Sequence, residues 1–371
     1  MVLPIAPNSP HSNGRGGGGA TPSRPFTKSA IQVCEETTTL TGALGGGRLR
    51  LTTPTGSFLR HLNLRSDVAV AAADAVPELD APHNAWQLIR IRDNAGGTFY
   101  ELSGYSAYLA DMFGGYGNPL FMSDLDPAFA VGAGGGTHVT RLPVEIVARS
   151  AFGALPNFND KAPITVELIP NDFATVYGVG TPPGDITVVA VAHGWAPPDT
   201  ASAAGIPQET SPPHTSTGGV VQQWSELTYA VPAGAGRVRC ERTGNVIRNM
   251  ILVARDPATG ARSDAFWPDR MVLSKGRNDI ISAPIDEWFS MHTQYFPGFG
   301  RPDGVIAIPF TDDFDGTPGG ELGDRYLETT TATRLEFSGS WVGAHDLTVI
   351  TNDLVISRAT SGPGSTMGAN E

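Results

Sequence analysis

Short stretches of alternating apolar and polar residues occur throughout the first half of the chain. Leu49 and Leu51 alternate with arginines, and the pattern that begins at Phe58 continues into an Ala- and Val-rich run ending near Ala73. A period of two is typical of a β-strand with one buried face. Strands are predicted in these two stretches and in residues 86–92, 98–102, 142–147, 164–169 and 185–191. The loop 93–97, Asp-Asn-Ala-Gly-Gly, supplies turn residues for a hairpin.

One helical pattern interrupts these strands. Apolar side chains recur at three- and four-residue spacing over residues 105–113, which is the period of a helix with a buried face. Ser103 is placed to act as the N-cap, and Gly114 and Gly115 follow the last apolar position. We therefore predict a helix that begins just after Ser103 and ends at Phe113.

The second half of the chain repeats this order of elements. Strands are predicted at 238–241, 245–255, 271–274, 279–282, 305–310, 333–338 and 346–351. A single helix is predicted between the fourth and fifth of these, with Pro284 near its first position and Asp286 and Glu287 in its first turn. Trp288 and Phe289 lie on its apolar face, and Pro297 ends it.

The repeated order predicts an all-β fold of two antiparallel, eight-stranded jelly rolls in tandem, a double jelly roll, with one short helix inserted in each roll. A parallel α/β sheet would need helices between most strands, and the pattern lacks them. Runs of Pro, Gly and polar residues set the predicted boundaries. These are a flexible N-terminal arm (1–35), a first roll (36–205), a linker (206–218), a second roll (219–358) and a C-terminal tail (359–371).

The composition agrees with this fold class. The 371 residues include 45 Gly and 30 Pro, and only 17% are charged, which argues against long helical repeats and coiled coils. The formal charge is −12 and lysine occurs three times, so we expect no direct binding of nucleic acid. No apolar stretch is long enough to span a membrane as a helix, and the first residues do not resemble a secretory signal.

Two cysteines, Cys34 and Cys240, lie far apart in the sequence. A disulfide between them is one interpretation, and two apolar, half-buried thiols are the interpretation that the spacing favours. Because unpaired thiols are typical of reducing compartments, we expect the chain to fold in a reducing cytoplasm.

The acidic loop 311–321 is the most suggestive local motif. Asp313, Asp315 and Gly316 match part of a calcium-binding loop, but Glu321 is out of register with the final ligand position of that loop. A turn-rich surface loop is the favoured interpretation, and a cation site is the alternative. We therefore predict no metal site and no cofactor.

We also predict no catalytic residues. The candidate carboxylates are interpreted as residues of turns and strand boundaries and not as an acid–base pair. They are Asp124, Asp126, Asp160, Asp172 and Asp185. The eight histidines form no pair with metal-ligand spacing. His61 and His292 lie in amphipathic elements and are predicted to be surface or interface residues.

Tryptophans and two loops suggest contacts between subunits. Large amphipathic side chains in or beside loops suit such contacts, although packing within their own domain is the alternative. The tryptophans in question are Trp195, Trp224, Trp267, Trp288 and Trp341. The segments 148–157 and 240–249 mix apolar and hydrogen-bonding groups in the same way.

Six phrases along the chain carry a family resemblance. They are GSFLRHLNL (56–64), RDNAGG (92–97), LSGYSAY (102–108), FGALPN (152–157), TGNVIRNMIL (243–252) and TRLEFSGS (333–340). In this order the chain resembles the double jelly-roll major capsid proteins of tectivirus-like bacteriophages, which are tailless and enclose an internal membrane. The resemblance covers about residues 40–356.

The resemblance implies a structural, non-enzymatic protein of the virion. It implies a homotrimer whose six jelly rolls form a pseudo-hexameric unit, and these units tile an icosahedral capsid over an internal lipid membrane. The implied partners are neighbouring capsomers and the penton and minor capsid proteins, with assembly in the host cytoplasm. Two other functions stay open on the residues alone: a trimeric receptor-binding or spike protein, and a double jelly-roll glycan hydrolase.

Overall fold

The computed structural model of the chain describes residues 32–68, 78–93, 96–114, 136–146, 153–177, 185–196, 220–296, 298, 300–310, 326–329 and 334–356. Several expectations from the sequence lie outside these residues. They are most of the N-terminal arm, the linker 206–218, the tail 359–371, the acidic loop with Asp313 and Asp315, and the pair Asp124 and Asp126.

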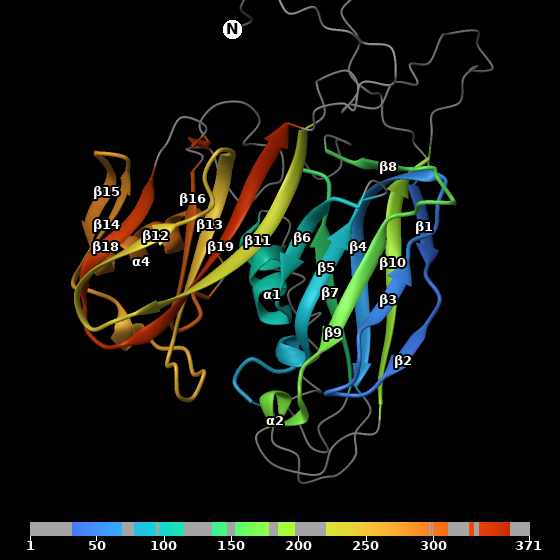
Figure 1. The fold of residues 1–371 in the computed structure, drawn as a ribbon, viewed down its shortest axis with the longest axis horizontal. Coiled ribbons are helices and arrows are strands. Elements are labelled where there is room, and N and C mark those ends of the chain that lie inside the picture. The colour runs from blue at the N-terminus through green and yellow to red at the C-terminus, as the bar shows by residue number, and fades with distance from the viewer. Residues whose placement is uncertain are drawn as a thin grey trace, which may run out of the picture.

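The first half of the chain forms two facing antiparallel sheets (Figure 1). One sheet has the order β1 (Gln32–Glu36), β10 (Ile186–Trp195), β4 (Ser57–Val68) and β7 (Gly136–Pro143), with β2 (Leu40–Gly42) beside β10 and β8 (Leu155–Asn157) beside β4. The other has the order β6 (Thr98–Leu102), β5 (Trp86–Arg92), β9 (Thr165–Pro170) and β3 (Leu49–Thr52). Alternate residues of each strand, such as Leu62 and Leu64, point into the core between them.

The second half repeats this architecture. One sheet has the order β11 (Val220–Val231), β19 (His345–Ile356), β13 (Val246–Arg255) and β16 (Val305–Pro309), with β17 (Leu327–Glu328) beside β13. The facing sheet has the order β12 (Gly234–Cys240), β18 (Leu335–Trp341), β14 (Arg270–Lys275) and β15 (Asn278–Pro284). Within the described residues each half is therefore a jelly roll of eight main strands, to which β2, β8 and β17 are short additions. We call the first half roll 1 and the second half roll 2, and the predicted fold class is confirmed.

The two predicted helices occupy the same place in each roll. Helix α1 (Gly104–Phe113) follows β6, and helix α4 (Ile285–Tyr295) follows β15. Their first residues are 181 positions apart, so the duplicated order of elements holds in three dimensions. The sequence did not predict the short helix α2 (Phe173–Val176) or the 3₁₀ turns η1 (His83–Ala85) and η4 (Asp264–Phe266).

The two rolls share one sheet. Strand β6 of roll 1 pairs in parallel with β11 of roll 2 through Trp224 opposite Tyr100 and Ser225 opposite Glu101. This pairing joins the inner sheets of both rolls into nine strands, in the order β16-β13-β19-β11-β6-β5-β9-β3 with β17 beside β13. The backbone itself therefore contributes to fixing one roll against the other.

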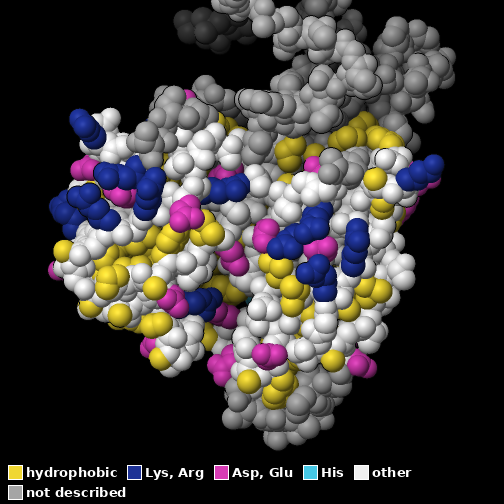
Figure 2. Space-filling view, in the orientation of Figure 1, with side chains coloured by type: hydrophobic (Ala, Val, Ile, Leu, Met, Phe, Trp, Pro, Cys, Tyr) yellow, Lys and Arg dark blue, Asp and Glu magenta, His cyan; other side chains and the backbone are white. Residues whose placement is uncertain are grey.

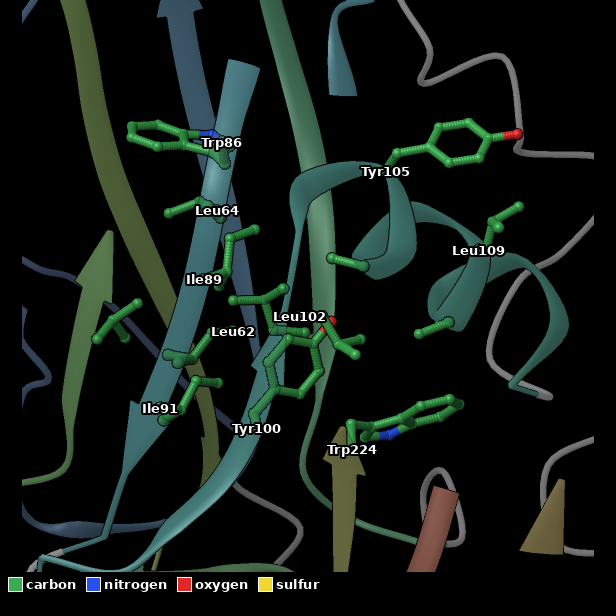
Figure 3. Packing of buried hydrophobic residues seen from close by; sticks show 14 of the residues in the cluster. Leu62, Leu64, Trp86, Ile89, Ile91, Tyr100, Leu102, Tyr105, Leu109 and Trp224 are labelled. Carbon is green, nitrogen blue, oxygen red and sulfur yellow. The ribbon is translucent and has the colours of Figure 1, made fainter. Parts of the chain in front are cut away.

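The apolar core is continuous across this junction. One cluster joins the interior of roll 1 and helix α1 to Trp224, Ile251 and Phe296 of roll 2, and Figure 3 shows Trp224 directly beneath α1. A second cluster fills roll 2. All five tryptophans assigned above to subunit contacts are at most 3% exposed. That assignment was wrong, because their indole rings pack inside the chain.

Several boundaries differ from the sequence prediction, and strand β11, which pairs with β6, was not predicted. Strand β1 begins at Gln32 and pairs with β10, so residues 32–35 belong to roll 1 and not to the arm. Strand β7 covers 136–143 rather than 142–147, because its ladder with β4 runs from Gly136 opposite Val68 to Pro143 opposite His61. Among the described helices, none has the length and apolarity needed to cross a membrane.

Candidate functional site at the seam between the jelly rolls

Helix α1 belongs to roll 1, but a carboxylate of roll 2 binds its N-terminus. Glu226 of β11 accepts a hydrogen bond from the backbone N–H of Ser103 at 2.8 Å, and its second oxygen lies 3.1 Å from the Ser103 hydroxyl. Ser103 holds the predicted N-cap position, yet its own side chain makes no capping bond. Burial raises the pKa of Glu226, while hydrogen bonds from Ser106 and Ser103 oppose that shift. A negative charge here complements the helix dipole.

Roll 2 also binds the C-terminus of α1. The Arg248 guanidinium donates to the carbonyl of Gly114 at 2.6 Å, and the Asn249 amide donates to the carbonyl of Phe113 at 3.3 Å. These carbonyls belong to the last turn of the helix and lack partners within it. A buried cation at this end complements the other pole of the dipole. Roll 2 therefore binds both ends of α1. We call the whole contact between the two rolls, including the pairing of β6 with β11, the seam.

An ion-pair cluster adds a third contact across the seam. Asp80 of roll 1 accepts a hydrogen bond from Arg262 at 2.8 Å and forms an ion pair with Arg255 at 2.6 Å, and both arginines belong to roll 2. The two guanidinium groups lie 5.1 and 4.8 Å from the centre of the Tyr105 ring. Burial raises the pKa of Tyr105, so its hydroxyl stays neutral. Because Asp80 is buried, removing either arginine would leave part of its negative charge without compensation.

Aromatic side chains close the remaining side of the seam. Phe113 of α1 makes edge-to-face contacts with Phe296 and His292, at ring-centre distances of 5.0 and 4.8 Å. His292 is fully buried, and its Nδ1 accepts from the backbone N–H of Ala307 at 3.1 Å. Burial lowers the pKa of His292 to about 4. A ring that is fully buried within one chain is neither on the surface nor at an interface between subunits, so the prediction that His292 is a surface or interface residue was wrong.

A second buried ion pair lies in roll 1, close to the start of β11. Arg60 donates to Glu145 through Nε at 2.9 Å and approaches the same oxygen through Nη2 at 2.8 Å. Trp195 donates to the other oxygen of Glu145, and the Arg60 guanidinium lies 4.2 Å from the centre of the Trp195 ring. The backbone carbonyl of Glu145 accepts from Gln222 of β11. This network links the interior of roll 1 to roll 2.

Two buried histidines lie beside α1. His83 stacks on Tyr108 with ring centres 4.0 Å apart, and its ring centre is 5.9 Å from that of His138. Burial lowers the pKa of His83 to about 3 and that of His138 to about 4. Both rings are therefore neutral at pH 7. The sequence carried no signal for this pair, because the two residues are far apart along the chain.

We expect these histidines to make the protein acid-labile. Each pKa is lower in the folded than in the unfolded chain, so their contribution is fully present above about pH 6.5 and is lost as the pH falls toward 4 and 3. For His138 the shift corresponds to a loss on the order of 3 kcal/mol. The substitution His83→Phe keeps an aromatic ring against Tyr108 and removes one of the two titratable imidazoles. Urea unfolding between pH 7 and 4 should show a smaller loss of stability for His83→Phe than for wild type. If the free energy of unfolding falls equally with pH in both proteins, His83 is not a source of the acid lability.

The structure brings His61 together with residues that the sequence did not connect to it. His61 of β4 stacks on His193 of β10 with ring centres 4.3 Å apart, and burial together with His193 lowers the pKa of His61 to about 2. His193 lies 3.9 Å from the sulfur of Cys34 on β1. His61 is half-buried on the outer face of the sheet, so its placement there agrees with the prediction of a surface or interface residue.

The cysteines are unpaired, as the sequence favoured. Cys34 is exposed on β1, whereas Cys240 is buried at the end of β12, so neither is half-buried. Burial raises the pKa of the Cys240 thiol to about 12. Asp160, Asp172 and Asp185 are exposed residues of a turn, of the start of α2 and of the start of β10. Within the described ranges, no three His, Cys, Asp or Glu side chains are grouped closely enough to hold a metal ion.

Arginines gather on the outer faces of both rolls, which the sequence did not reveal. In roll 1 three of them lie 3.5–3.8 Å from Glu167 of β9; they are Arg48, Arg90 and Arg92. In roll 2, Arg334 and Arg237 lie 3.1 and 3.9 Å from Glu336 of β18. Figure 2 shows such neighbouring positive and negative side chains on the visible face. The carboxylates offset part of the positive charge of each group.

The fold is that of the double jelly-roll capsid proteins. The major capsid protein of Sulfolobus turreted icosahedral virus matches with a TM-score of 0.61 at 13% identity, over 89% of this chain and 98% of that one. The major capsid protein P2 of bacteriophage PM2 matches with a TM-score of 0.55 at 9% identity, over 87% and 97%. A chain of the PBCV-1 virus capsid matches with a TM-score of 0.62 at 10% identity, over 90% and 95%.

No family model and no curated protein sequence matches this chain. The likeness therefore lies in the fold, at identities of 9–13%. It extends over nearly the full length of the capsid chains and includes both jelly rolls in tandem.

Proposed function

We propose that this chain is a major capsid protein, a structural and non-catalytic building block of an icosahedral virus shell. The observation that carries the proposal is the seam. Two complete jelly rolls are joined by a shared sheet, a continuous core and a helix bound at both ends. Such a chain is a rigid two-roll unit, and the similar capsid chains consist of the same unit from end to end.

The proposed assembly is a homotrimer in which six similar rolls form a pseudo-hexameric unit. The repeated order of strands and helices supports this, because three copies would present six nearly equivalent surfaces to their neighbours. Neighbouring capsomers, the penton and minor capsid proteins and an internal lipid membrane are the proposed partners. The proposed location is the virion, after assembly in the host cytoplasm.

The proposed arm, linker and tail connect to the same end of the molecule. Gln32 pairs with Trp195, and Val220 pairs with Ile356. Figure 1 shows that the ends of β10 and β19 both lie toward the top of the molecule. This arrangement supports a division in which one end of the unit carries the arm before Gln32, the linker 206–218 and the tail 359–371.

The test of the proposal is the mass and shape of the purified full-length chain. Analytical ultracentrifugation should give a mass of three chains, and negative-stain electron microscopy should show hexagonal bricks. In purified particles this chain should be the most abundant band. A monomer that releases glycans from a polysaccharide substrate would overturn the proposal in favour of a hydrolase.

Removal of residues 1–30 should leave folding intact and impair lattice assembly. Strand β1 begins at Gln32, so the truncation spares every described strand. A terminal arm that becomes ordered on a neighbour contributes only in the assembled state. Thermal unfolding should match that of the full chain, while electron microscopy should show bricks that do not form shells. Normal particles from the truncated chain would contradict a role of the arm in assembly.

A further inference from the structure

An apolar groove lies on the edge of roll 2, between β15, α4 and β16. Its volume is about 370 Å³, and its lining includes Ile280, Ile281, Trp288, Met291 and Phe310. Ile280 is 39% exposed. Strand β15 is an edge strand of its sheet, so one row of its backbone groups has no partner among the described strands. We call β15 and α4 together the groove face. Figure 1 shows β15 at the side of roll 2 away from roll 1.

Roll 1 has the same surface, and there it is covered. Strand β6 and helix α1 correspond to β15 and α4, because each helix directly follows its strand and closes the same side of its roll. Across the seam, β6 pairs with β11, and α1 packs on the outer side of β13. The seam is therefore a contact between the helix side of one roll and the β11 side of the next. On roll 2, His292 of α4 packs against Phe113 of roll 1, but strand β15 and the groove beside it have no such cover among the described residues.

Each roll has a β-bulge with a buried arginine, and these two bulges show which residues of the two rolls are equivalent. In roll 1, the ladder between β4 and β10 skips Arg60, and His61 resumes the pairing. In roll 2, the ladder between β13 and β19 skips Arg248, and Asn249 resumes it. Both arginines are buried. The bulges thus mark equivalent positions on equivalent strands.

This alignment places Cys34 of β1 where Trp224 stands on β11. On β10, His193 pairs both with the residue after the bulge and with Cys34. On β19, Asn352 pairs both with the residue after the bulge and with Trp224. Strand β1 therefore corresponds to β11. Unlike β11, which lies between β19 and β6, β1 is at the edge of its sheet among the described strands.

Tyr100, the residue of roll 1 that pairs with Trp224, also has an equivalent residue in roll 2. Trp224 pairs with Tyr100, which lies four residues before the start of α1. Ile281 lies four residues before the start of α4. A contact between rolls that repeats the seam would therefore bring Cys34 beside Ile281. Within one chain the two lie on different rolls, so the repeated contact requires a second copy.

We propose that the groove face of one chain docks on the β1 edge (Gln32–Glu36) of a second copy, with Cys34 beside Ile281. The inference rests on the proposed capsid function and names the surfaces that join its copies. The contact is heterologous, because two different surfaces meet, and such contacts close into a ring when the rotation between copies allows it. Two edge strands that pair across the interface would also satisfy the free backbone groups of both.

The contact between copies lacks one feature of the seam. Glu36 corresponds to Glu226, but Pro284 stands at the position of Ser103 and has no N–H to donate. Asp286 and Glu287 already occupy the first turn of α4. The interface between copies therefore depends on the apolar groove and the edge strands, without a charged cap. For this reason we expect it to be weaker than the seam and to form between folded chains.

Cysteine cross-linking of the full-length chain tests the proposal. Ile280→Cys places an exposed thiol next to Ile281, and native Cys34 is the expected partner; Cys240 is buried and unreactive. A short bis-maleimide should yield covalent dimers and trimers of Ile280→Cys, which disappear when Cys34→Ser is added. Val342→Cys is the matched control, because Val342 is 64% exposed and lies outside the groove face. Equal cross-linking of both cysteine variants, or none, would overturn the proposal.

A charge in the groove provides a second measurement. Ile280→Asp should weaken association of copies at least about tenfold, because the carboxylate would lose water on docking, and Val342→Asp should leave association unchanged. If trimers form while both aspartate variants associate normally, the interface is wrong and the capsid function stands. If Ile280→Cys cross-links through Cys34 but no hexagonal bricks form, the interface is right and the capsid function fails.

Discussion

Arg248→Met is expected to lower the free energy of unfolding by about 3 kcal/mol, because it removes a charge-assisted hydrogen bond and leaves the carbonyl of Gly114 without its side-chain donor. Arg248 is 1% exposed and donates to Gly114 at 2.6 Å. Methionine keeps much of the apolar stem, so the loss reports mainly on the guanidinium. The same substitution removes the cation that faces the C-terminal end of the α1 dipole.

Urea unfolding at a fixed protein concentration measures this effect, since association of copies would otherwise add to the apparent stability. Arg237→Met is the matched control, because the Arg237 side chain is 68% exposed and lies 3.9 Å from Glu336. A surface pair of this kind contributes about 0–1 kcal/mol. Arg248→Lys should fall between wild type and Arg248→Met, because it keeps the charge and loses the planar fork. Equal losses for Arg248→Met and Arg237→Met would mean that the seam does not depend on Arg248.

The local pattern of the sequence was enough to predict the fold. Alternation at Leu49 and Leu51, the helical spacing over 105–113 and Pro284 at the start of α4 are all short-range signals, and the structure confirms each of them. The repetition of these signals in the same order predicted the duplicated roll. Boundaries were less certain where a ladder partner decides them, as in β7, whose pairing with β4 extends back to Gly136.

The seam could not be predicted, because its residues only meet in three dimensions. Glu226 and Ser103 are 123 positions apart, and Arg248 and Gly114 are 134 apart. Ser103 was recognised as the N-cap, but the group that binds there comes from the other roll. The segment 240–249 was singled out for assembly contacts, and its last two residues bind the end of α1 within the same chain. His292 lies in a helix that the sequence predicts to be amphipathic, which suggested an exposed position, but packing against Phe113 of the other roll buries it.

The buried pair of Arg60 and Glu145 should show strong energetic coupling in a double-mutant cycle. Arg60→Met and Glu145→Gln should each cost about 3–5 kcal/mol, because each leaves one buried charge without its partner. The double variant should cost much less than the sum of the two, because the new side-chain amide can still accept from Trp195 and no unpaired charge remains. We expect a coupling energy of at least about 2 kcal/mol.

The control for this cycle lies on the same strand. Arg65 of β4 lies 3.9 Å from Glu36, and the two side chains are 50% and 58% exposed. In unassociated chains water screens that pair, so Arg65→Met and Glu36→Gln should be additive to within about 0.5 kcal/mol when unfolding is measured below the concentration at which copies associate. Urea unfolding of both cycles in the same buffer makes the comparison direct. Additive losses for Arg60 and Glu145 would show that the pair does not stabilise the junction of roll 1 with β11, and the seam would then depend on its other contacts: the two caps of α1, the pairing of β6 with β11, the shared core and the Asp80 cluster.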